Sequence, residues 1–441
     1  MVLPAALAAL ALMTATVQAG GNLDTSGFGY RAEIRITGYT QAETLTNFPV
    51  LVTLGTNIAG FAYSQFASGT GGDLRFASDT GEELNYEMDT WNSAGISYVW
   101  VQVPALSGSG TMISAYWGRA GLTPPSYTTN GATWSNGYLG VWHLNQPNAV
   151  NSVSGHVGTA HGNTTTAGCI GSGQYFSTNS YNTYLSLGNL RATNLTIEAW
   201  TLHANPGDYG GANVDDVVFW KSGSFKWYQW NVDWNLQLDI VGATTYSFQH
   251  NGITDLPLPS WTSLAVSYDS TTGTGRGYLS GMNRYSDVKG ANVPYQNNNV
   301  CTLGYNSGGA GSYYGSIDEV RLSNVVRSDN WLRACYQNQL SPGAFMSFDL
   351  MSRLVATPGP AGDLVLSWIG SSQTLQVSPA LGADAAWTTN GLPAPIVSDG
   401  VNRVTVSCAP AAAFYRLAVL VKDFSLSASP ASLSIAQSGS G

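Results

Sequence analysis

The stretch GSIDEVRLS, residues 315–323, decides the fold of this chain. Apolar residues alternate with polar ones along it, which is the pattern of a β-strand with one buried face. Similar short runs precede it, separated by clusters of Gly, Ser, Thr and Asn. They include VWHLN at 141–145, LTIEAWT at 195–201 and WTSLAVSYD at 261–269. No long stretch repeats apolar residues at helical spacing, so the sequence predicts an all-β protein.

The composition agrees with short strands joined by turns. The chain has 441 residues, with 51 Gly, 23 Tyr and 14 Trp, and 10% of its residues are charged. The formal net charge is -9 and the pI is near 4.9. Nucleic-acid binding depends on clustered Lys and Arg, so no nucleic-acid partner is expected. Neutral glycans and bound cations are both compatible with an acidic chain.

Five segments of the second half resemble, in order, the strands of laminin-G-like (concanavalin A-like) jelly rolls from secreted bacterial proteins. They are VWHLN, YF at 175–176, TIEAW at 196–200, the run W-x-x-LAVSYD, and G-x-IDEVRLS. The resemblance implies a domain that binds glycans, proteins or calcium and less often hydrolyses a substrate. Fold alone does not establish function.

The block before the jelly roll resembles an uncharacterised module of secreted bacterial proteins. The matching pieces are FPVLVTL at 48–54, DLRFASDTGEELNYE at 73–87, VWVQVP at 99–104 and YWG at 116–118. This resemblance brings no known activity. Short strands at this spacing predict a β-sandwich.

The predicted fold class is therefore all-β, with a β-sandwich module followed by a concanavalin A-like jelly roll and a small C-terminal β module. A linker with Pro124 and Pro125 separates the first two. A jelly roll closes its own core, so residues 134–348 are expected to fold alone. The predicted boundaries are 1–19 for a signal peptide, 26–120 for the first module, 130–348 for the jelly roll, 354–421 for the small β module, and 422–441 for a truncated Ig-like repeat or a disordered tail.

The first 19 residues resemble a secretory signal. They are rich in Ala and Leu and end in Val17-Gln18-Ala19, where a small residue suits signal peptidase. The run is shorter than the roughly 20 residues that span a bilayer. We expect a secreted or cell-surface protein with no membrane span in the mature chain. No Lys or Arg precedes the apolar run, which fits a fragment of a longer protein.

The four cysteines are Cys169, Cys301, Cys335 and Cys408. Four cysteines allow three pairings, and the sequence does not choose among them. An exported protein allows one disulfide, whereas the alternative is buried free thiols.

The sequence contains none of the common catalytic motifs. Glycosidases on jelly rolls commonly place paired carboxylates as E-x-D-x-x-E on one strand face, and this run is missing. Asp318 and Glu319 are adjacent, so strand alternation predicts that they point to opposite faces. The motifs H-E-x-x-H and G-x-S-x-G and the P-loop are also missing. We expect no catalytic residues and no enzymatic activity.

The resemblance also implies a metal ligand at Asp318. In many jelly rolls of this kind, an acidic residue here helps to hold a structural calcium together with backbone oxygens. Calcium takes six to eight oxygen ligands, and this sequence identifies only Asp318 clearly. Asn145 stands where relatives often carry an acid. The alternative is an exposed or turn-capping aspartate without a metal.

Aromatic residues crowd between positions 219 and 234. Aromatic rings beside amide and carboxylate groups form a platform for a sugar, whose CH faces stack on the rings. On this hypothesis the ligand-binding residues are Tyr209, Trp227 and Gln229. The alternative is that the tryptophans form the core, because large aromatics dominate sandwich cores.

These observations predict a secreted, non-catalytic binding protein whose partner is a glycan or an extracellular protein. Two alternatives stay open. One is a structural or adhesive surface protein, and the other is the accessory part of a polysaccharide-degrading enzyme.

Overall fold

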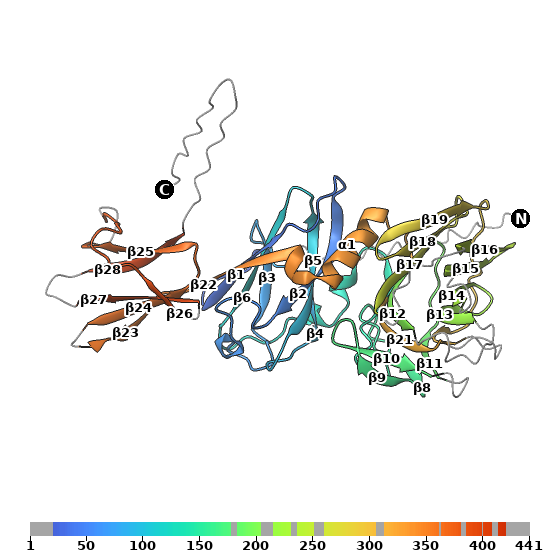
Figure 1. Cartoon of the computed structure of the whole chain (residues 1–441), viewed down its shortest axis with the longest axis horizontal. Coiled ribbons are helices and arrows are strands. Elements are labelled where there is room, and N and C mark those ends of the chain that lie inside the picture. Colours follow the sequence, from blue (N-terminus) through green and yellow to red (C-terminus); the bar gives the residue numbers. More distant parts are fainter. Residues whose placement is uncertain are drawn as a thin grey trace, which may run out of the picture.

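The computed structural model describes residues 21–177, 183–203, 215–230, 236–250, 260–305, 313–360, 363–380, 385–398, 400–407 and 413–419. Three β modules lie in a row, with the first module between the jelly roll and the C-terminal module (Figure 1). The predicted all-β fold is confirmed. Two α-helices occur in the described ranges, α1 (Asp329–Leu340) and α2 (Pro342–Phe345). No described helix is long and apolar enough to cross a membrane.

The first module is a sandwich of two antiparallel sheets. One has the order β22-β1-β6-β3 and the other the order β2-β5-β4. Their inner faces carry the apolar positions of each alternating strand, including Ile34, Phe48 and Val101. The bounds are β1 Tyr30–Ile36, β2 Leu45–Leu54, β3 Arg75–Ser78, β4 Tyr86–Thr90, β5 Ser97–Leu106, β6 Thr111–Trp117 and β22 Met346–Ser352, with short 3-10 turns at Tyr63–Gln65, Ser126–Thr128 and Ala132–Trp134.

Strand β22 follows the jelly roll in sequence but belongs to the first module. It pairs with β1, and Phe348 lies opposite Ile34. The predicted boundary of the jelly roll at residue 348 was therefore wrong. The physical reason is that the backbone of β22 pairs with the edge strand β1, which lets Met346 and Leu350 pack into the core of the first module.

The jelly roll consists of two facing sheets. We call the sheet β19-β18-β17-β12-β21-β10-β9, with β7 paired to β21, the proximal sheet. We call the sheet β16-β15-β14-β13-β20-β11-β8 the distal sheet, because it lies farther from the first module (Figure 1). The proximal bounds are β7 Tyr138–Trp142, β9 Thr164–Ala167, β10 Ser172–Phe176, β12 Leu195–His203, β17 Thr262–Asp269, β18 Thr274–Leu279, β19 Met282–Val288 and β21 Gly315–Ser323. The distal bounds are β8 Thr159–His161, β11 Tyr184–Gly188, β13 Asp215–Lys221, β14 Phe225–Trp230, β15 Leu236–Val241, β16 Thr245–His250 and β20 Cys301–Leu303.

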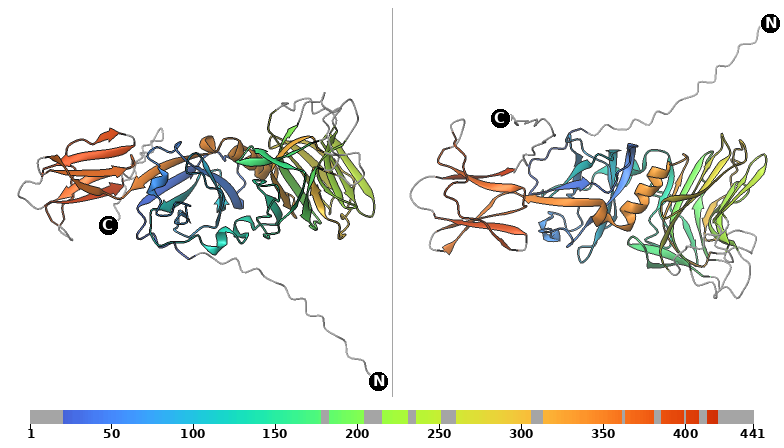
Figure 2. Two further views of the ribbon diagram at one scale, coloured as in Figure 1. Left: turned by 90° about the horizontal axis from the view of Figure 1, so that it is seen from below. Right: turned by 45° about the horizontal axis from the view of Figure 1, so that its top comes forward.

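The outer face of the proximal sheet packs against the first module. Tyr138, Val141 and Tyr278 share one hydrophobic core with first-module residues such as Phe48. Helix α1 lies at this junction (Figure 2). The jelly roll has an inner core of its own, but the outer face of its proximal sheet contacts the first module instead of solvent. The expectation that residues 134–348 fold alone therefore overlooked a shared core.

Helix α1 follows the jelly roll in the chain and bonds to the first module near its C-terminus. Ser328 caps its N-terminus by accepting a hydrogen bond from the backbone N–H of Trp331. Near its C-terminus, Asn338 accepts a hydrogen bond from the N–H of Leu51 at 2.7 Å and donates one to the C=O of Leu51 at 3.0 Å. The amide of Asn338 thus pairs with β2 as a neighbouring strand would.

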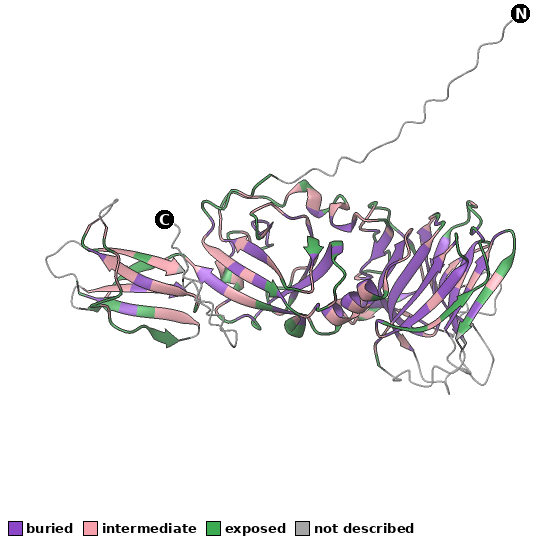
Figure 3. Ribbon diagram, turned by 90° about the horizontal axis from the view of Figure 1, so that it is seen from above, coloured by how far each residue is buried: buried purple, intermediate pink, exposed green. Residues whose placement is uncertain are grey.

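The C-terminal module has two small sheets, β23-β24-β27-β26 and β25-β28. Its strands are more exposed than those of the jelly roll (Figure 3). Its core is small and centres on Leu366, Trp368 and Val404. The bounds are β23 Val355–Pro358, β24 Leu364–Ile369, β25 Gln373–Ser378, β26 Ile396–Ser398, β27 Val401–Val406 and β28 Phe414–Val419.

Three cysteines are free thiols, namely Cys169, Cys301 and Cys335. The sequence left open a disulfide or free thiols, and for these three cysteines the structure agrees with free thiols. Cys408, the predicted signal peptide and the predicted tail lie outside the described residues.

Candidate functional site

The outer face of the distal sheet carries a row of aromatic and polar side chains. Strand alternation produces it, because Phe219, Phe225 and Leu238 point into the core and their neighbours point away. The strand register aligns one residue from each strand. In order from β16 to β8 the row is Ser247, Asp239, Lys226, Trp220, Thr302, Ser186 and Thr159. Trp220 therefore occupies the middle of the sheet, with polar residues on both sides.

Trp220 is half-buried and is not part of the jelly-roll core. On one side, the ammonium of Lys226 lies 3.7 Å from the ring centroid of Tyr228 and 3.7 Å from Asp239 Oδ2. This arrangement holds an aromatic ring and a charged pair in fixed positions beside the Trp220 indole.

Gln249 on β16 extends the polar surface, and the buried Gln237 on β15 links it to Asp239. Gln249 donates a hydrogen bond to Gln237 at 2.7 Å, and Gln237 donates one to Asp239 at 3.1 Å. Gln249 and Ser247 are exposed. Amide and carboxylate groups held in this way present both donors and acceptors to a ligand.

Three stacked rings flank the other end of the row. The rings of His161 and Tyr184 lie 4.0 Å apart with an interplanar angle of 8°, and those of Tyr184 and Tyr305 lie 4.9 Å apart at 24°. His161 Nε2 is 3.3 Å from the hydroxyl of Ser186, a member of the row. Both ends of the outer face thus combine rings with hydrogen-bonding groups.

The sequence prediction chose the wrong face of this hairpin. Trp227 and Gln229 are fully buried, because β14 pairs with β15 so that they lie opposite Leu238 and Leu236. The predicted exposure of Trp227 was therefore wrong. The sequence did contain a signal for the inner face of β14, namely the alternating apolar residues at 236–240 on its partner strand β15. The third predicted residue, Tyr209, lies outside the described residues.

Gln229 lies near a buried imidazole inside the jelly roll. His203 Nδ1 is 3.8 Å from Asp216 Oδ2, and the His203 side chain is 1% exposed. Burial lowers the pKa of His203 from 6.5 to about 4, although Gln229 opposes this shift. The folded chain therefore keeps this ring neutral in mild acid, whereas the unfolded chain protonates it.

This difference predicts acid sensitivity. As the pH falls from 6.5 to 4, the unfolded state gains a proton at His203 that the folded state does not bind. Folding stability should fall by on the order of 3 kcal/mol over this window. Urea unfolding at pH 7 and pH 4 should show a larger loss in the wild type than in His203→Gln. An equal pH dependence in both proteins would contradict the assignment.

The backbone of β21 departs from strand alternation at the predicted metal ligand. Ile317, Val320 and Leu322 point into the core, so two consecutive residues, Asp318 and Glu319, lie on the outer face. The register with β12 shifts here, and Glu319 has a φ of 49°. This is a β-bulge, which adds a residue to one strand. The prediction that the two carboxylates point to opposite faces was therefore wrong.

Asp318 is fully buried at the junction with the first module. Its carboxylate accepts hydrogen bonds from the backbone N–H of Ile170 at 2.9 Å and from that of Glu319 at 2.8 Å. Burial and the adjacent Glu319 raise the pKa of Asp318 well above its ordinary value. Asn145 accepts a hydrogen bond from the N–H of Ser172. The described residues thus give Asp318 backbone N–H partners, and calcium binding there stays a prediction.

The fold and this outer face together define an all-β protein whose jelly roll presents one polar and aromatic sheet face. Residues 171–333 match the concanavalin A-like lectin/glucanases superfamily. Residues 70–133 match a domain of unknown function, DUF2341. Both segments agree with the resemblances found in the sequence, and the laminin-G-like assignment is confirmed. No curated protein matches the chain.

Several solved structures are similar at low identity. Domain 4 of AbnA, a GH43 extracellular arabinanase from Geobacillus stearothermophilus in complex with arabinotriose, is 17% identical. That match covers 45% of this chain and 97% of the other, with a TM-score of 0.36. The botulinum neurotoxin type G receptor binding domain is 10% identical over 64% of this chain and 81% of the other, with a TM-score of 0.37. A heptameric SAP-like pentraxin from Limulus polyphemus is 12% identical over 37% and 80%, with a TM-score of 0.28.

Proposed function

We propose that this protein is a secreted, non-catalytic binding protein that recognises a glycan through the outer face of the distal sheet. The observation that supports this most is the row centred on Trp220, in which one aromatic ring stands between hydrogen-bonding side chains on every neighbouring strand. The match of residues 171–333 to a lectin and glucanase superfamily is consistent with the proposal.

The chemistry of the row suits a carbohydrate. A sugar ring has apolar CH faces that pack on an indole and hydroxyl groups that exchange hydrogen bonds at its edge. Trp220 supplies a partly exposed ring, while Asp239, Lys226 and the exposed Gln249 supply acceptors and donors. The outer face of the proximal sheet is covered by the first module, so the distal sheet presents the broader accessible face.

A structural or adhesive role at the cell surface is the second candidate. The shared core of the first module and the jelly roll favours it, because such a unit would transmit force as one body. An accessory role beside a polysaccharide-degrading domain would use the same glycan-binding face. A structural calcium held through Asp318 is part of the proposal for the jelly roll.

The glycan proposal predicts a large effect of one substitution. Trp220→Ala should weaken binding about 30-fold, which corresponds to about 2 kcal/mol, the range of an interface hot spot. The melting temperature should hardly change, because the indole is outside the core. A glycan array would identify the ligand, and isothermal titration calorimetry on the best glycan would give the two affinities.

The matched control is Trp387→Ala, which removes a half-buried tryptophan from the C-terminal module. It should leave affinity unchanged. A wild-type protein that binds no glycan on the array, or a Trp220→Ala variant with wild-type affinity, would disprove the proposal. A wild-type protein that binds an extracellular protein but no glycan would favour the adhesive role.

A further inference from the structure

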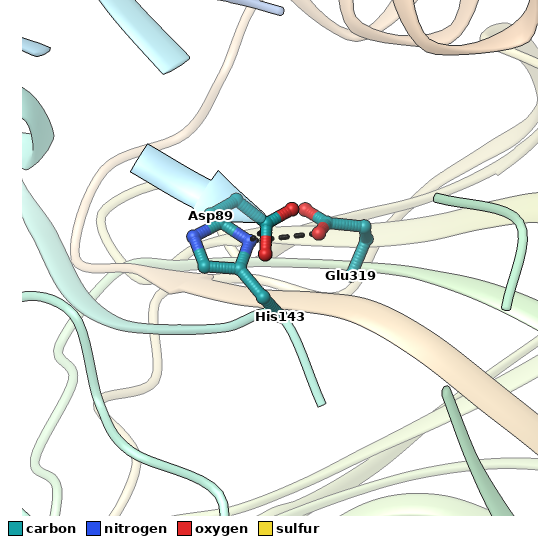
Figure 4. Close-up of side chains that lie close together, drawn as sticks. All are labelled: Asp89, His143 and Glu319. Carbon is teal, nitrogen blue, oxygen red and sulfur yellow. Dashed lines mark hydrogen bonds and ion pairs between the residues drawn. The ribbon is translucent and has the colours of Figure 1, made fainter. Parts of the chain in front are cut away.

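A second group of polar side chains lies at the junction of the first module and the jelly roll. Asp89 comes from β4 of the first module, His143 directly follows β7, and Glu319 belongs to the bulge of β21. One ligand atom from each lies within 4.8 Å of the other two. Figure 4 shows both carboxyl groups turned toward the same nitrogen of the His143 ring. Residues far apart in the sequence thus converge on one point.

The side chains of Asp89, His143 and Glu319 lie close together and are shielded from solvent. His143 Nδ1 is 2.7 Å from Glu319 Oε1 and 3.9 Å from Asp89 Oδ2. His143 Nε2 is 3.8 Å from Glu87 Oε2. The side chains of Asp89 and Glu319 are 0% exposed and that of His143 is 9% exposed. Solvent therefore screens these groups little.

Two atoms of the group lack the hydrogen bonds that buried polar atoms normally have. Asp89 Oδ2 and His143 Nε2 are buried and have no hydrogen-bond partner among the described residues. Asp89 uses its other oxygen to accept a hydrogen bond from Asn145. Asp89 Oδ2 faces His143 Nδ1, whereas His143 Nε2 lies on the other side of the ring, toward Glu87. Asp89 Oδ2 is therefore a buried carboxylate oxygen aimed at the proposed site, and carboxylates coordinate metals.

The net charge of the groups at the junction is negative, which favours the binding of a cation. Three carboxyl groups contact cations here, those of Glu87, Asp89 and Glu319. In the described part of the chain, the cationic groups in contact with them are His143 and Arg321. Arg321 is paired with Glu319 Oε2 at 2.9 Å and lies over the ring of Trp100. The negative charge therefore exceeds the positive charge by about one if every group ionises.

The electrostatic field at the imidazole agrees with this count. Burial alone would lower the pKa of His143, but the carboxylates of Glu319 and Asp89 raise it well above its ordinary value. Burial raises the pKa of Asp89 to about 6. A metal ion at His143 Nδ1 would have to displace this proton.

A cavity gives access to this point. It has a volume of about 380 Å³ and is lined by Glu87, Asp89, His143 and Asn145, among others. An ion could enter through it, and water could complete the coordination there. Of the three residues of the group, Asp89 and His143 line the cavity, and Glu319 lies behind them.

From this geometry we propose that Asp89, His143 and Glu319 bind one divalent transition-metal ion of the zinc type, with water completing its coordination. One imidazole nitrogen and two carboxylates suit zinc better than calcium, which prefers oxygen ligands alone. Binding replaces the proton on His143 Nδ1, so a proton is released. Because Asp89 belongs to the first module and the other ligands to the jelly roll, the ion locks the two modules together.

The test uses the full chain without a polyhistidine tag, stripped with a chelator. Calorimetry with Zn²⁺ should give one ion per chain, and Zn²⁺ should raise the melting temperature. Replacement by Co²⁺ should give visible absorption bands of mixed nitrogen and oxygen coordination. Asp89→Asn, which keeps the shape of the side chain, should weaken Zn²⁺ binding at least tenfold. The matched control Asp239→Asn, on the distal face, should bind Zn²⁺ as the wild type does.

Glu319→Gln provides a second variant if Asp89→Asn does not fold, and the Co²⁺ spectrum of the wild type needs no variant. The proposal is overturned if the wild type binds no stoichiometric Zn²⁺, or if both variants bind it with unchanged affinity. It is also overturned if Ca²⁺ alone raises the melting temperature and Asp318→Asn, but not Asp89→Asn, abolishes that shift. That result would instead support calcium at Asp318.

Discussion

Replacing Trp227 with alanine is expected to destabilise the jelly roll by about 3–5 kcal/mol, the cost of removing a large aromatic side chain from a packed core. Trp227 is fully buried between the two sheets, where β15 places Leu238 opposite it. The cavity left behind would be lined by apolar side chains that cannot close it completely. Urea unfolding followed by circular dichroism would measure the loss.

Trp220→Ala is the matched comparison, because Trp220 lies on the neighbouring strand but on the outer face. Its cost in stability should be about 1 kcal/mol or less. The two variants therefore separate the core from the proposed binding face. If Trp220→Ala were the more destabilising of the two, the assignment of inner and outer faces would be reversed.

Asn338→Ala is expected to have the second largest effect. Its amide makes two hydrogen bonds with the backbone of Leu51, and it is 1% exposed. The substitution leaves a buried N–H and a buried C=O without partners, and each costs about 1–3 kcal/mol. We expect a total loss of about 2–5 kcal/mol. Because the contact joins α1 to β2, calorimetry should show whether the first module and the jelly roll still unfold in one transition.

The control for this experiment is Gln337→Ala, one position earlier in the same helix. Gln337 is only half-buried. Its replacement should change stability by less than about 0.5 kcal/mol, since alanine also favours a helix. Equal effects of the two substitutions would show that the helix, rather than the Asn338 amide, accounts for the loss.

Local patterns in the sequence were sufficient to predict most of the strands. Alternation of apolar and polar residues identified β12, β17 and β21, although all nine residues of β21 are buried because the first module covers their outer face. In the aromatic hairpin, the same rule could not tell which face lies in the core, because both faces of β13 and β14 carry aromatic residues. The pairing partner decided that, since Leu236 and Leu238 on β15 need apolar residues opposite them.

Two features escaped prediction because they depend on contacts between distant segments. The bulge at Glu319 turns two adjacent carboxylates to one face, and no motif of the sequence marks it. Strand β22 returns to the first module, although its own alternation would suit a strand of either domain. In both cases the local sequence permits several structures, and the energy of pairing with a remote partner selects one.

Strand periodicity and turn composition are local properties, so the sequence was enough to predict an acidic, all-β protein. Its resemblance to laminin-G-like jelly rolls, carried by five short motifs, identified that module. The tertiary structure alone decided which rings face outward on the distal sheet and which carboxylates meet His143 at the junction. Those arrangements depend on strand register and on the docking of one module against another. Asp89 becomes a neighbour of Glu319 only when both sandwiches have formed and buried their shared surface.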